Sequence, residues 1–326
     1  MSSLEQTEAE ISRIAPIFQG ARREIARIVV GQARMVDALL LAMLCDGHVL
    51  LEGAPGLAKT TAIKALASAL QLQFSRIQFT PDLLPADLVG TQIYEPKTGE
   101  FRTRKGPVFC NLLLADEINR APAKVQSALL EAMQERQVTI GDQTYPLPSP
   151  FLVLATQNPI EQEGTYPLPE AQTDRFMLKL TVAYPTREEE LEIVARSIQA
   201  TPSLTPVATA EHILQAQAVV RQIRITDPLM QYIIDVVRAT RDPGGVDPKL
   251  ARCVSFGASP RASISLAAAA RGRAFLDGRG FCLPEDVKQV APDVLRHRIL
   301  PTYEAEAEGI TAAAIVERVL TAVKMP

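Results

Sequence analysis

The chain has 326 residues, of which 47% are hydrophobic and 22% charged, so it can form one large or two ordinary domains and is not a disordered protein. Its formal net charge of −3 gives no overall attraction to nucleic acid or to an anionic membrane. The longest apolar run, Ala38 to Cys45, is too short to span a membrane.

The first thirty residues are predicted to be helical, because Ile11, Ile14, Ala15 and Phe18 recur at the spacing of one helix face. This segment has no basic stretch followed by an apolar core, which a secretion signal would need. It also has no glycine at position two for acylation. We therefore expect a cytoplasmic protein without membrane insertion.

Residues 48–67 predict a buried strand, a glycine-rich loop and a helix. Residues 53–60 read Gly-Ala-Pro-Gly-Leu-Ala-Lys-Thr. The backbone N–H groups of such a loop bind phosphate together with the N-terminus of the following helix. Lys59 would contact the outer phosphates, and the Thr60 hydroxyl would bind Mg²⁺. The predicted nucleotide-binding residues are Gly53, Ala54, Pro55, Gly56, Leu57, Ala58, Lys59, Thr60 and Thr61. The alternative is an ordinary strand–turn–helix corner.

One position of this loop departs from the usual pattern. Ala58 stands immediately before the lysine, where the phosphate loop usually has glycine. A methyl group there crowds a backbone that must lie close to a phosphate. The Lys-Thr pair, the apolar strand before the loop and the helix after it still favour a nucleoside triphosphate site.

Five short apolar runs predict the strands of one parallel sheet. They alternate with helices, and near-continuous apolar runs are typical of parallel strands that are covered on both faces. The pattern predicts a doubly wound α/β domain that binds its ligand at the carboxyl edge of the sheet. The predicted strands are Val49–Leu51, Phe74–Phe79, Asn111–Ala115, Phe151–Thr156 and Phe176–Val182.

Two hairpins are predicted between these strands, at residues 91–102 and 137–147. The region of the first carries Arg102, Arg104 and Lys105, the densest group of cations in the chain. These cations could contact a partner or nucleic acid. We favour a solvated hairpin rim, because three cations make a weak electrostatic footprint.

The third predicted strand ends in two acids, Asp116 and Glu117. An ionised carboxylate at the end of a buried strand is costly unless a cation or a donor meets it. Asp116 would bind Mg²⁺ through water, and Glu117 would act as general base for the water that attacks the γ-phosphate. The alternative is that both acids cap the helix that starts near Ala121. We favour hydrolysis, because a phosphate loop lies upstream.

Three further polar residues are candidates near the phosphates. Asn158 follows the fourth strand, where it could donate to a γ-phosphate oxygen or orient water, unless it only forms an Asn-Pro turn. Arg175, in a short helix before the last strand, could act on a neighbouring subunit's nucleotide or form a salt bridge within its own domain. Spacing alone does not separate these two roles. Arg120 is a second, weaker candidate for action on a neighbour.

The pattern becomes helical after Tyr184-Pro185, so the predicted domains are an α/β core with N-terminal helices at 1–185 and a smaller all-helical domain at 186–326. Arg261 lies in the first turn of the helix predicted at 260–277, where a cation opposes the helix dipole. A nucleotide phosphate at this helix start would turn that cost into a gain. The alternative is a surface arginine that only contacts solvent.

Four segments together resemble the MoxR family of AAA+ ATPases, in the helix-2-insert clade. The similarity runs from about Ile28 to about Ala270. The family tolerates alanine before the lysine, which bears on Ala58. The segments that carry the resemblance are Glu52–Thr60, Leu114–Pro122, Ala155–Glu161 and Gly164–Gln172.

The resemblance implies an ATPase that uses ATP and Mg²⁺ and forms a hexameric ring with nucleotide bound between subunits. It implies that Asp116 is the metal acid, Glu117 the catalytic acid, Asn158 the first sensor and Arg261 the second, and that Arg175 is the arginine acting in trans. The hairpins match the inserts of the clade. The implied partners are protein clients matured in a chaperone-like way and proteins with a von Willebrand factor A domain.

We therefore expect a ring-forming ATPase that remodels or matures other proteins. A nucleic-acid motor is the main alternative, but a net charge of −3 and one small basic hairpin give little footprint for it. A small-molecule kinase is a third hypothesis. The adjacent Asp-Glu pair and the separate helical domain argue against a kinase.

Overall fold

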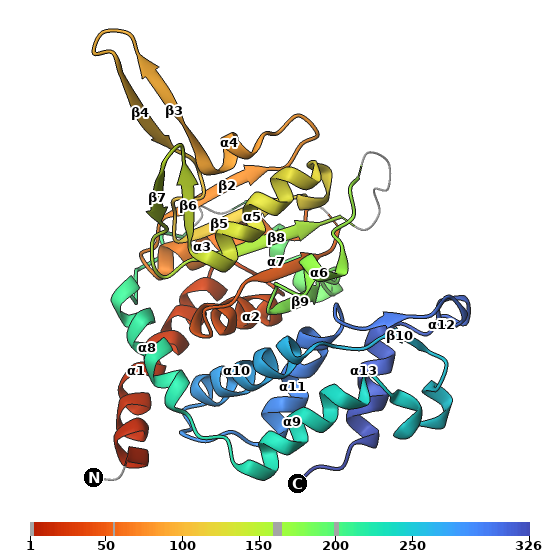
Figure 1. Ribbon diagram of the computed structural model, residues 1–326. Helices are drawn as coiled ribbons and strands as arrows, with labels where there is room; N and C mark the ends of the chain where they lie inside the picture. The colour runs from red at the N-terminus through yellow and green to blue at the C-terminus, as the bar shows by residue number, and fades with distance from the viewer. Residues whose placement is uncertain (1–2, 55, 159–164, 199–201) are drawn as a thin grey trace. The chain divides into compact units, whose positions relative to one another are not determined.

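The computed structural model describes residues 3–54, 56–158, 165–198 and 202–326 (Figure 1). The chain divides into two compact units. The sheet unit comprises Ile17–Arg175 and Leu180–Leu214, and the helical unit comprises Met1–Pro16, Phe176–Lys179 and Gln215–Pro326. Each unit has its own core, and each is described separately below.

The main sheet has five strands in the order β2-β5-β8-β1-β9, and all of it except Leu178 and Lys179 of β9 belongs to the sheet unit. The pairings of β2 with β5, of β5 with β8 and of β8 with β1 are all parallel. These findings confirm the predicted doubly wound parallel sheet. The strands are β1 (Val49–Glu52), β2 (Phe74–Gln78), β5 (Leu112–Asp116), β8 (Leu152–Gln157) and β9 (Leu178–Thr181).

The three central strands share one pattern of burial. In β1, β5 and β8 every residue is buried except the last, which is half-buried and polar: Glu52, Asp116 and Gln157. Strands covered on both faces must be apolar throughout, and only their ends can carry groups that meet solvent or ligand. Because parallel strands end at the same edge, this pattern gathers polar groups along the carboxyl edge of the sheet.

The helices of this part of the chain begin and end mostly where the sequence predicts. Helix α3 starts at Lys59, directly after the glycine-rich loop. Helix α2 was not predicted as a helix, since nine of its residues are buried and it leaves no polar face to mark a helical period. The helices are α1 (Ser3–Ala26), α2 (Ala33–Leu44), α3 (Lys59–Ala69), α4 (Pro85–Val89), α5 (Ala123–Glu135), α6 (Glu170–Thr173) and α7 (Arg187–Ser197).

Helix α7 belongs to the sheet unit, which continues to Leu214, whereas the sequence places the boundary of the first domain at residue 185. The Arg196 side chain donates to the carbonyl oxygens of Ala26 at 3.1 Å and Arg27 at 2.7 Å. These bonds hold α7 to the segment that follows α1. Sequence composition could not show this, because both segments are ordinary amphipathic stretches far apart in the chain.

Both predicted hairpins are present and lie in the sheet unit. The ribbon of β3 (Gly90–Glu95) and β4 (Glu100–Lys105) projects away from the sheet, beside the ribbon of β6 (Gln137–Ile140) and β7 (Gln143–Pro146) (Figure 1). The Thr103 and Tyr145 hydroxyls are 3.0 Å apart and join the two ribbons.

The largest part of the helical unit, Gln215–Pro326, follows the sheet unit in the chain, as the fold class predicts, and it also contains a short strand pair that was not predicted. The pair is antiparallel, and its two and three residues are too few to leave an alternating pattern. No helix among the described residues is both long and apolar enough to cross a membrane. The elements are α8 (Ala210–Gln222), α9 (Asp227–Ala239), β10 (Val254–Phe256), α10 (Pro260–Leu276), α11 (Pro284–Leu295), β11 (Leu300–Pro301), α12 (Tyr303–Ala307) and α13 (Ala312–Ala322).

A buried histidine fixes the start of β1. The backbone N–H of Val153 donates to His48 Nδ1 at 3.0 Å, so Nε2 carries the proton and donates to the Met133 carbonyl at 3.1 Å. Burial, and then the positive charge of Arg136, lower the pKa of His48 to about 3. His48 is therefore a neutral cross-link between β1, β8 and α5.

This histidine should make the fold sensitive to acid. Between pH 6.5 and about pH 3 the unfolded chain binds a proton at His48 that the folded chain does not, so stability is full above pH 6.5 and falls below it. At about 1.4 kcal/mol per pH unit, the loss between pH 6.5 and about pH 5 is about 2 kcal/mol. We expect His48→Gln to lose about 2 kcal/mol less than the wild type between about pH 7 and pH 5, measured by urea unfolding. Equal losses in the two proteins would contradict this.

Candidate active site

Two residues of the loop between β1 and α3 have a left-handed backbone conformation. Gly56 has φ +83° and Ala58 has φ +56°, both in the left-handed region. Glycine adopts such a φ without strain, whereas for alanine it costs about 1–2 kcal/mol. The backbone at Ala58 is therefore strained. Pro55 lies outside the described residues.

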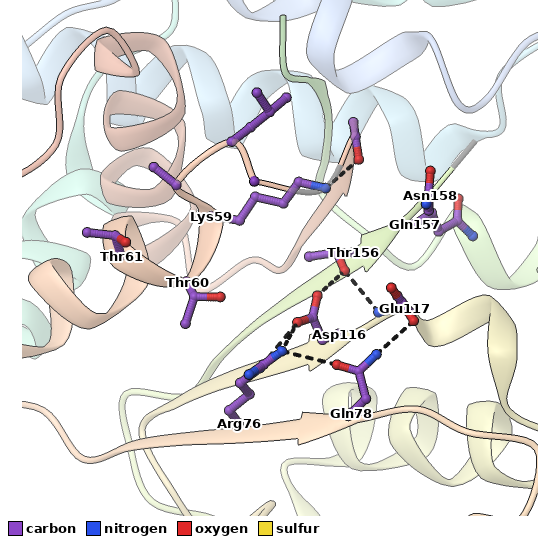
Figure 2. A pocket seen from close by; sticks show the side chains of 14 residues that line it. Lys59, Thr60, Thr61, Arg76, Gln78, Asp116, Glu117, Thr156, Gln157 and Asn158 are labelled. Carbon is purple, nitrogen blue, oxygen red and sulfur yellow. Dashed lines mark hydrogen bonds and ion pairs between the residues drawn. The ribbon is translucent and has the colours of Figure 1, made fainter. Parts of the chain in front are cut away.

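The loop forms one wall of a cavity of about 380 Å³, and the carboxyl ends of β2, β5 and β8 form the other (Figure 2). The predicted residues that line it are Gly53, Gly56, Leu57, Ala58, Lys59, Thr60, Thr61, Asp116, Glu117 and Asn158. Among the described part of the loop, Ala54 is buried and is not one of the lining residues. The structure thus brings together side chains that are up to a hundred positions apart in the sequence.

Lys59 lies at the mouth of the loop. Its Nζ donates to the Gly53 carbonyl at 2.5 Å, so the side chain folds back over the loop (Figure 2). Burial lowers the pKa of Lys59, while the nearby carboxylates of Asp116 and Glu117 act in the opposite direction. A lysine held in this way can exchange its carbonyl partner for a phosphate oxygen with a small movement.

Both oxygens of the Asp116 carboxylate accept hydrogen bonds from the chain. The Thr156 hydroxyl donates to Oδ1 at 2.6 Å. The Arg76 guanidinium donates to Oδ2 from Nη2 at 2.7 Å and from Nε at 3.2 Å. Asp116 is therefore held between β2 and β8, its neighbours on either side in the sheet (Figure 2).

Glu117 is also oriented by several neighbours. Its Oε2 accepts from Gln78 Nε2 at 2.7 Å and lies 3.0 Å from Arg120 Nε. Its backbone N–H donates to the Thr156 hydroxyl at 2.9 Å. Its φ of +55° is a left-handed conformation that costs a non-glycine residue about 1–3 kcal/mol and is typical of active sites. The acid is thus aimed into the cavity by backbone geometry.

Sequence reasoning did not identify Arg76, Gln78 and Thr156. A signal for the first two exists, because they are polar residues two apart at the end of a predicted strand and so point to the same face. Thr156 leaves no such signal. Its side chain is only 1% exposed, and threonine is common in buried strands for its shape alone.

The predicted arginines lie in different places. Arg120 is 3.0 Å from its own Glu117. Arg175 donates to the Leu130 carbonyl at 3.2 Å and is not among the described residues that line the cavity. Arg261 lies in the first turn of α10, in the helical unit, where its backbone N–H donates to the Ser259 hydroxyl. The roles predicted for Arg175 and Arg261 stay predictions.

The oxygen donors of the cavity fit Mg²⁺ bound together with a nucleotide. Thr60 and Asp116 both line it, and a hydroxyl and a carboxylate are ligands that Mg²⁺ prefers. Over the residues that the structure describes, there is no group of three or more His, Cys, Asp or Glu side chains suited to a metal. Mg²⁺ in such sites takes most of its ligands from phosphates and water, so two protein oxygens are enough.

A second cavity, of about 490 Å³, adjoins the first. The two share Gly56, Leu57, Ala58 and Thr61, and the second adds apolar side chains from far along the chain: Ile28, Val30, Pro185 and Ile193. Its lining also includes polar side chains, among them Arg27, Gln32 and Arg196. A pocket with apolar walls and a few polar groups, next to the phosphate loop, fits the flat base of a nucleotide. It was not predicted, because its walls come from segments on either side of the α/β core sequence.

Comparisons with known proteins agree with this geometry. The model of the ATPase family associated with various cellular activities (AAA) matches residues 48–178, and that of the AAA lid domain matches residues 250–319. The chain is 52% identical over 306 residues to Chaperone MoxR1 of Mycobacterium tuberculosis, covering 93% of this chain and 81% of that one. It is 35% identical over 319 residues to Protein MoxR of Paracoccus denitrificans, covering 91% and 93%. A solved structure from Cytophaga hutchinsonii, of a protein assigned as an ATPase, matches with a TM-score of 0.94 at 49% identity, and the match covers 100% of both chains.

Proposed function

The chain belongs to the MoxR family of AAA+ ATPases, and on that premise we propose that a ring of its subunits uses ATP hydrolysis to remodel or mature partner proteins. The chain is an ATP hydrolase. The observation that carries the proposal is the single cavity in which Lys59, Asp116, Glu117 and Asn158 meet the phosphate loop.

In the proposed reaction, the loop N–H groups and Lys59 bind the phosphates of ATP. Mg²⁺, held by Thr60 and Asp116, would neutralise charge on the β- and γ-phosphates. Glu117 accepts a proton from the attacking water, and Asn158 orients that water or a γ-phosphate oxygen. The apolar second cavity takes the adenine base.

The β3–β4 hairpin supports a protein as the client. Tyr94 and Phe101 are 53% and 67% exposed and lie opposite each other in the ribbon, with their rings 5.3 Å apart. Exposed apolar groups gathered in this way are typical of surfaces that bind proteins. The word chaperone in the name of the Mycobacterium tuberculosis relative agrees with a protein client.

Arg175 is not among the residues that line the phosphate cavity of its own subunit. Its predicted role therefore needs the nucleotide of a neighbouring subunit, which a ring would supply. We propose a hexamer, as the family resemblance implies, located in the cytoplasm. A protein with a von Willebrand factor A domain is the proposed partner class. We also propose that the chain has two functional domains, residues 1–185 and 186–326, and that the second acts as a lid.

The test combines assembly and capture. We expect Glu117→Gln to form rings with ATP in analytical ultracentrifugation and to retain a partner on an affinity column. The matched control is the double variant Lys59→Ala/Glu117→Gln, which should not hold ATP. A chain that stays monomeric with ATP at every concentration would contradict the ring. Stimulation of ATP hydrolysis by DNA that falls steeply with salt would favour the nucleic-acid motor instead.

A further inference from the structure

Arg76 holds the carboxylate that we assign to Mg²⁺, and neither the sequence reasoning nor the proposed mechanism uses it. We propose that Arg76 is the internal counter-ion of Asp116, and that Mg²⁺ and Arg76 compete for the charge of this carboxylate. This inference rests on the proposed function, since it needs Asp116 to be the metal acid.

Both oxygens of the Asp116 carboxylate are engaged by the chain. Oδ1 accepts one hydrogen bond, from the hydroxyl of Thr156, whose side chain is buried. Oδ2 accepts two donors from the single guanidinium of Arg76, at 2.7 and 3.2 Å. Hydrogen bonds between a guanidinium and a carboxylate are charge-assisted and stronger than those between neutral groups. A metal ion that approaches Asp116 therefore meets a carboxylate that already has Arg76 as its counter-ion.

Arg76 reaches Oδ2 of Asp116 along its strand. In the parallel pairing of β2 with β5, Gln78 lies opposite Asp116, and Arg76 lies opposite Leu114, so the arginine leans toward the carboxyl edge of the sheet. Its Nη2 also donates to Gln78 Oε1 at 3.1 Å. Arg76 is 48% exposed in its side chain while Asp116 is 18% exposed, so the arginine can swing out without breaking the core.

Charge decides what Mg²⁺ does to this pair. A guanidinium and a divalent cation held by one carboxylate would lie within a few ångströms of each other and repel. When Mg²⁺ binds, Arg76 leaves Asp116. When Mg²⁺ is absent, Arg76 and Lys59 are the positive charges that line the cavity from opposite walls and meet the phosphates.

The proposal makes opposite predictions for binding with and without the metal. Removing the charge of Arg76 weakens metal-free nucleotide binding, because one cation is lost from the cavity. The same change strengthens Mg²⁺ binding, because Asp116 no longer has an internal competitor. A residue that only supported the fold would change both affinities in the same direction.

The experiment measures the dissociation constant of a fluorescent ATP analogue in EDTA and in saturating Mg²⁺, and the Mg²⁺ concentration at half-saturation. For Arg76→Gln we expect the EDTA-to-Mg²⁺ ratio of dissociation constants to rise about tenfold, as the loss of one charge-assisted contact would give. The Mg²⁺ midpoint should fall severalfold. Arg76→Lys, which keeps the charge, should give an intermediate ratio.

The matched control is Arg22→Gln. Arg22 pairs with Asp37 at 2.7 Å with a side-chain exposure of 53%, close to that of Arg76, but it lines neither of the two cavities described above. The EDTA-to-Mg²⁺ ratio of dissociation constants for this variant should equal that of the wild type. A ratio for Arg76→Gln that is unchanged or lower, in a wild type that binds ATP with Mg²⁺, overturns this inference alone. A wild type that binds no ATP under either condition overturns the proposed function, and this inference with it.

Discussion

Glu117→Gln should slow the hydrolysis of bound ATP at least about a hundredfold, the usual cost of removing a general base. The amide keeps an oxygen that can accept from Gln78 Nε2, now at 2.7 Å from the carboxylate, so the local structure should hold. It cannot take a proton from water. The measurement is phosphate release in a single turnover, alongside the dissociation constant of ATP, which should change little.

A control for this variant lies nearby. Glu131→Gln makes the same change on the exposed face of α5, outside the residues that line the cavity in the described chain, and should hydrolyse ATP like the wild type. If Glu117→Gln turned over ATP at the wild-type rate, Glu117 could not be the base, and its strained backbone would need another explanation.

Arg175→Ala should reduce hydrolysis by about a thousandfold or more, the range that an arginine supplied by a neighbouring subunit gives in other phosphoryl-transfer enzymes. The guanidinium would stabilise the charge on the transferred phosphoryl group. Nucleotide affinity should fall much less than the rate, because the subunit's own phosphate loop is intact. The measurement compares the rate constant with the dissociation constant in the purified ring.

Mixing variants separates action in trans from a structural role. Arg175→Ala subunits keep Glu117, and Glu117→Gln subunits keep Arg175, so a mixed ring contains some complete sites. We expect a mixture of the two to hydrolyse ATP faster than either alone. Absence of rescue at every mixing ratio would point instead to the contact with the Leu130 carbonyl, 3.2 Å away, and to a role within one subunit.

The sheet and the phosphate loop could be predicted because their signals are local. A strand covered on both faces is apolar along its length, so Phe151–Thr156 was recognisable and the observed strand is Leu152–Gln157. Asp116 at the end of β5 and Glu117 directly after it were recognisable for the same reason, as polar groups where an apolar run stops.

The parts that sequence reasoning missed depend on contacts between distant segments. The second cavity joins Ile28 and Val30 to Ile193, and no local pattern in the sequence marks such a meeting. The role of Thr156 depends on two bonds to a neighbouring strand. The role predicted for Arg175 depends on a neighbouring subunit, which lies outside the single chain.

The strand order of the sheet bears on how the protein folds. Strand β1 lies between β8 and β9, and His48 bonds to Val153 across 105 positions of sequence. On a ribosome, β1 would have no strand to pair with until synthesis had passed β8. Contacts between such distant segments close slowly, since the entropy of a long loop must be lost first. The phosphate loop should thus become able to bind ATP late in folding. ATP can stabilise the sheet only after β8, the last of the central strands in the chain, has paired with β1.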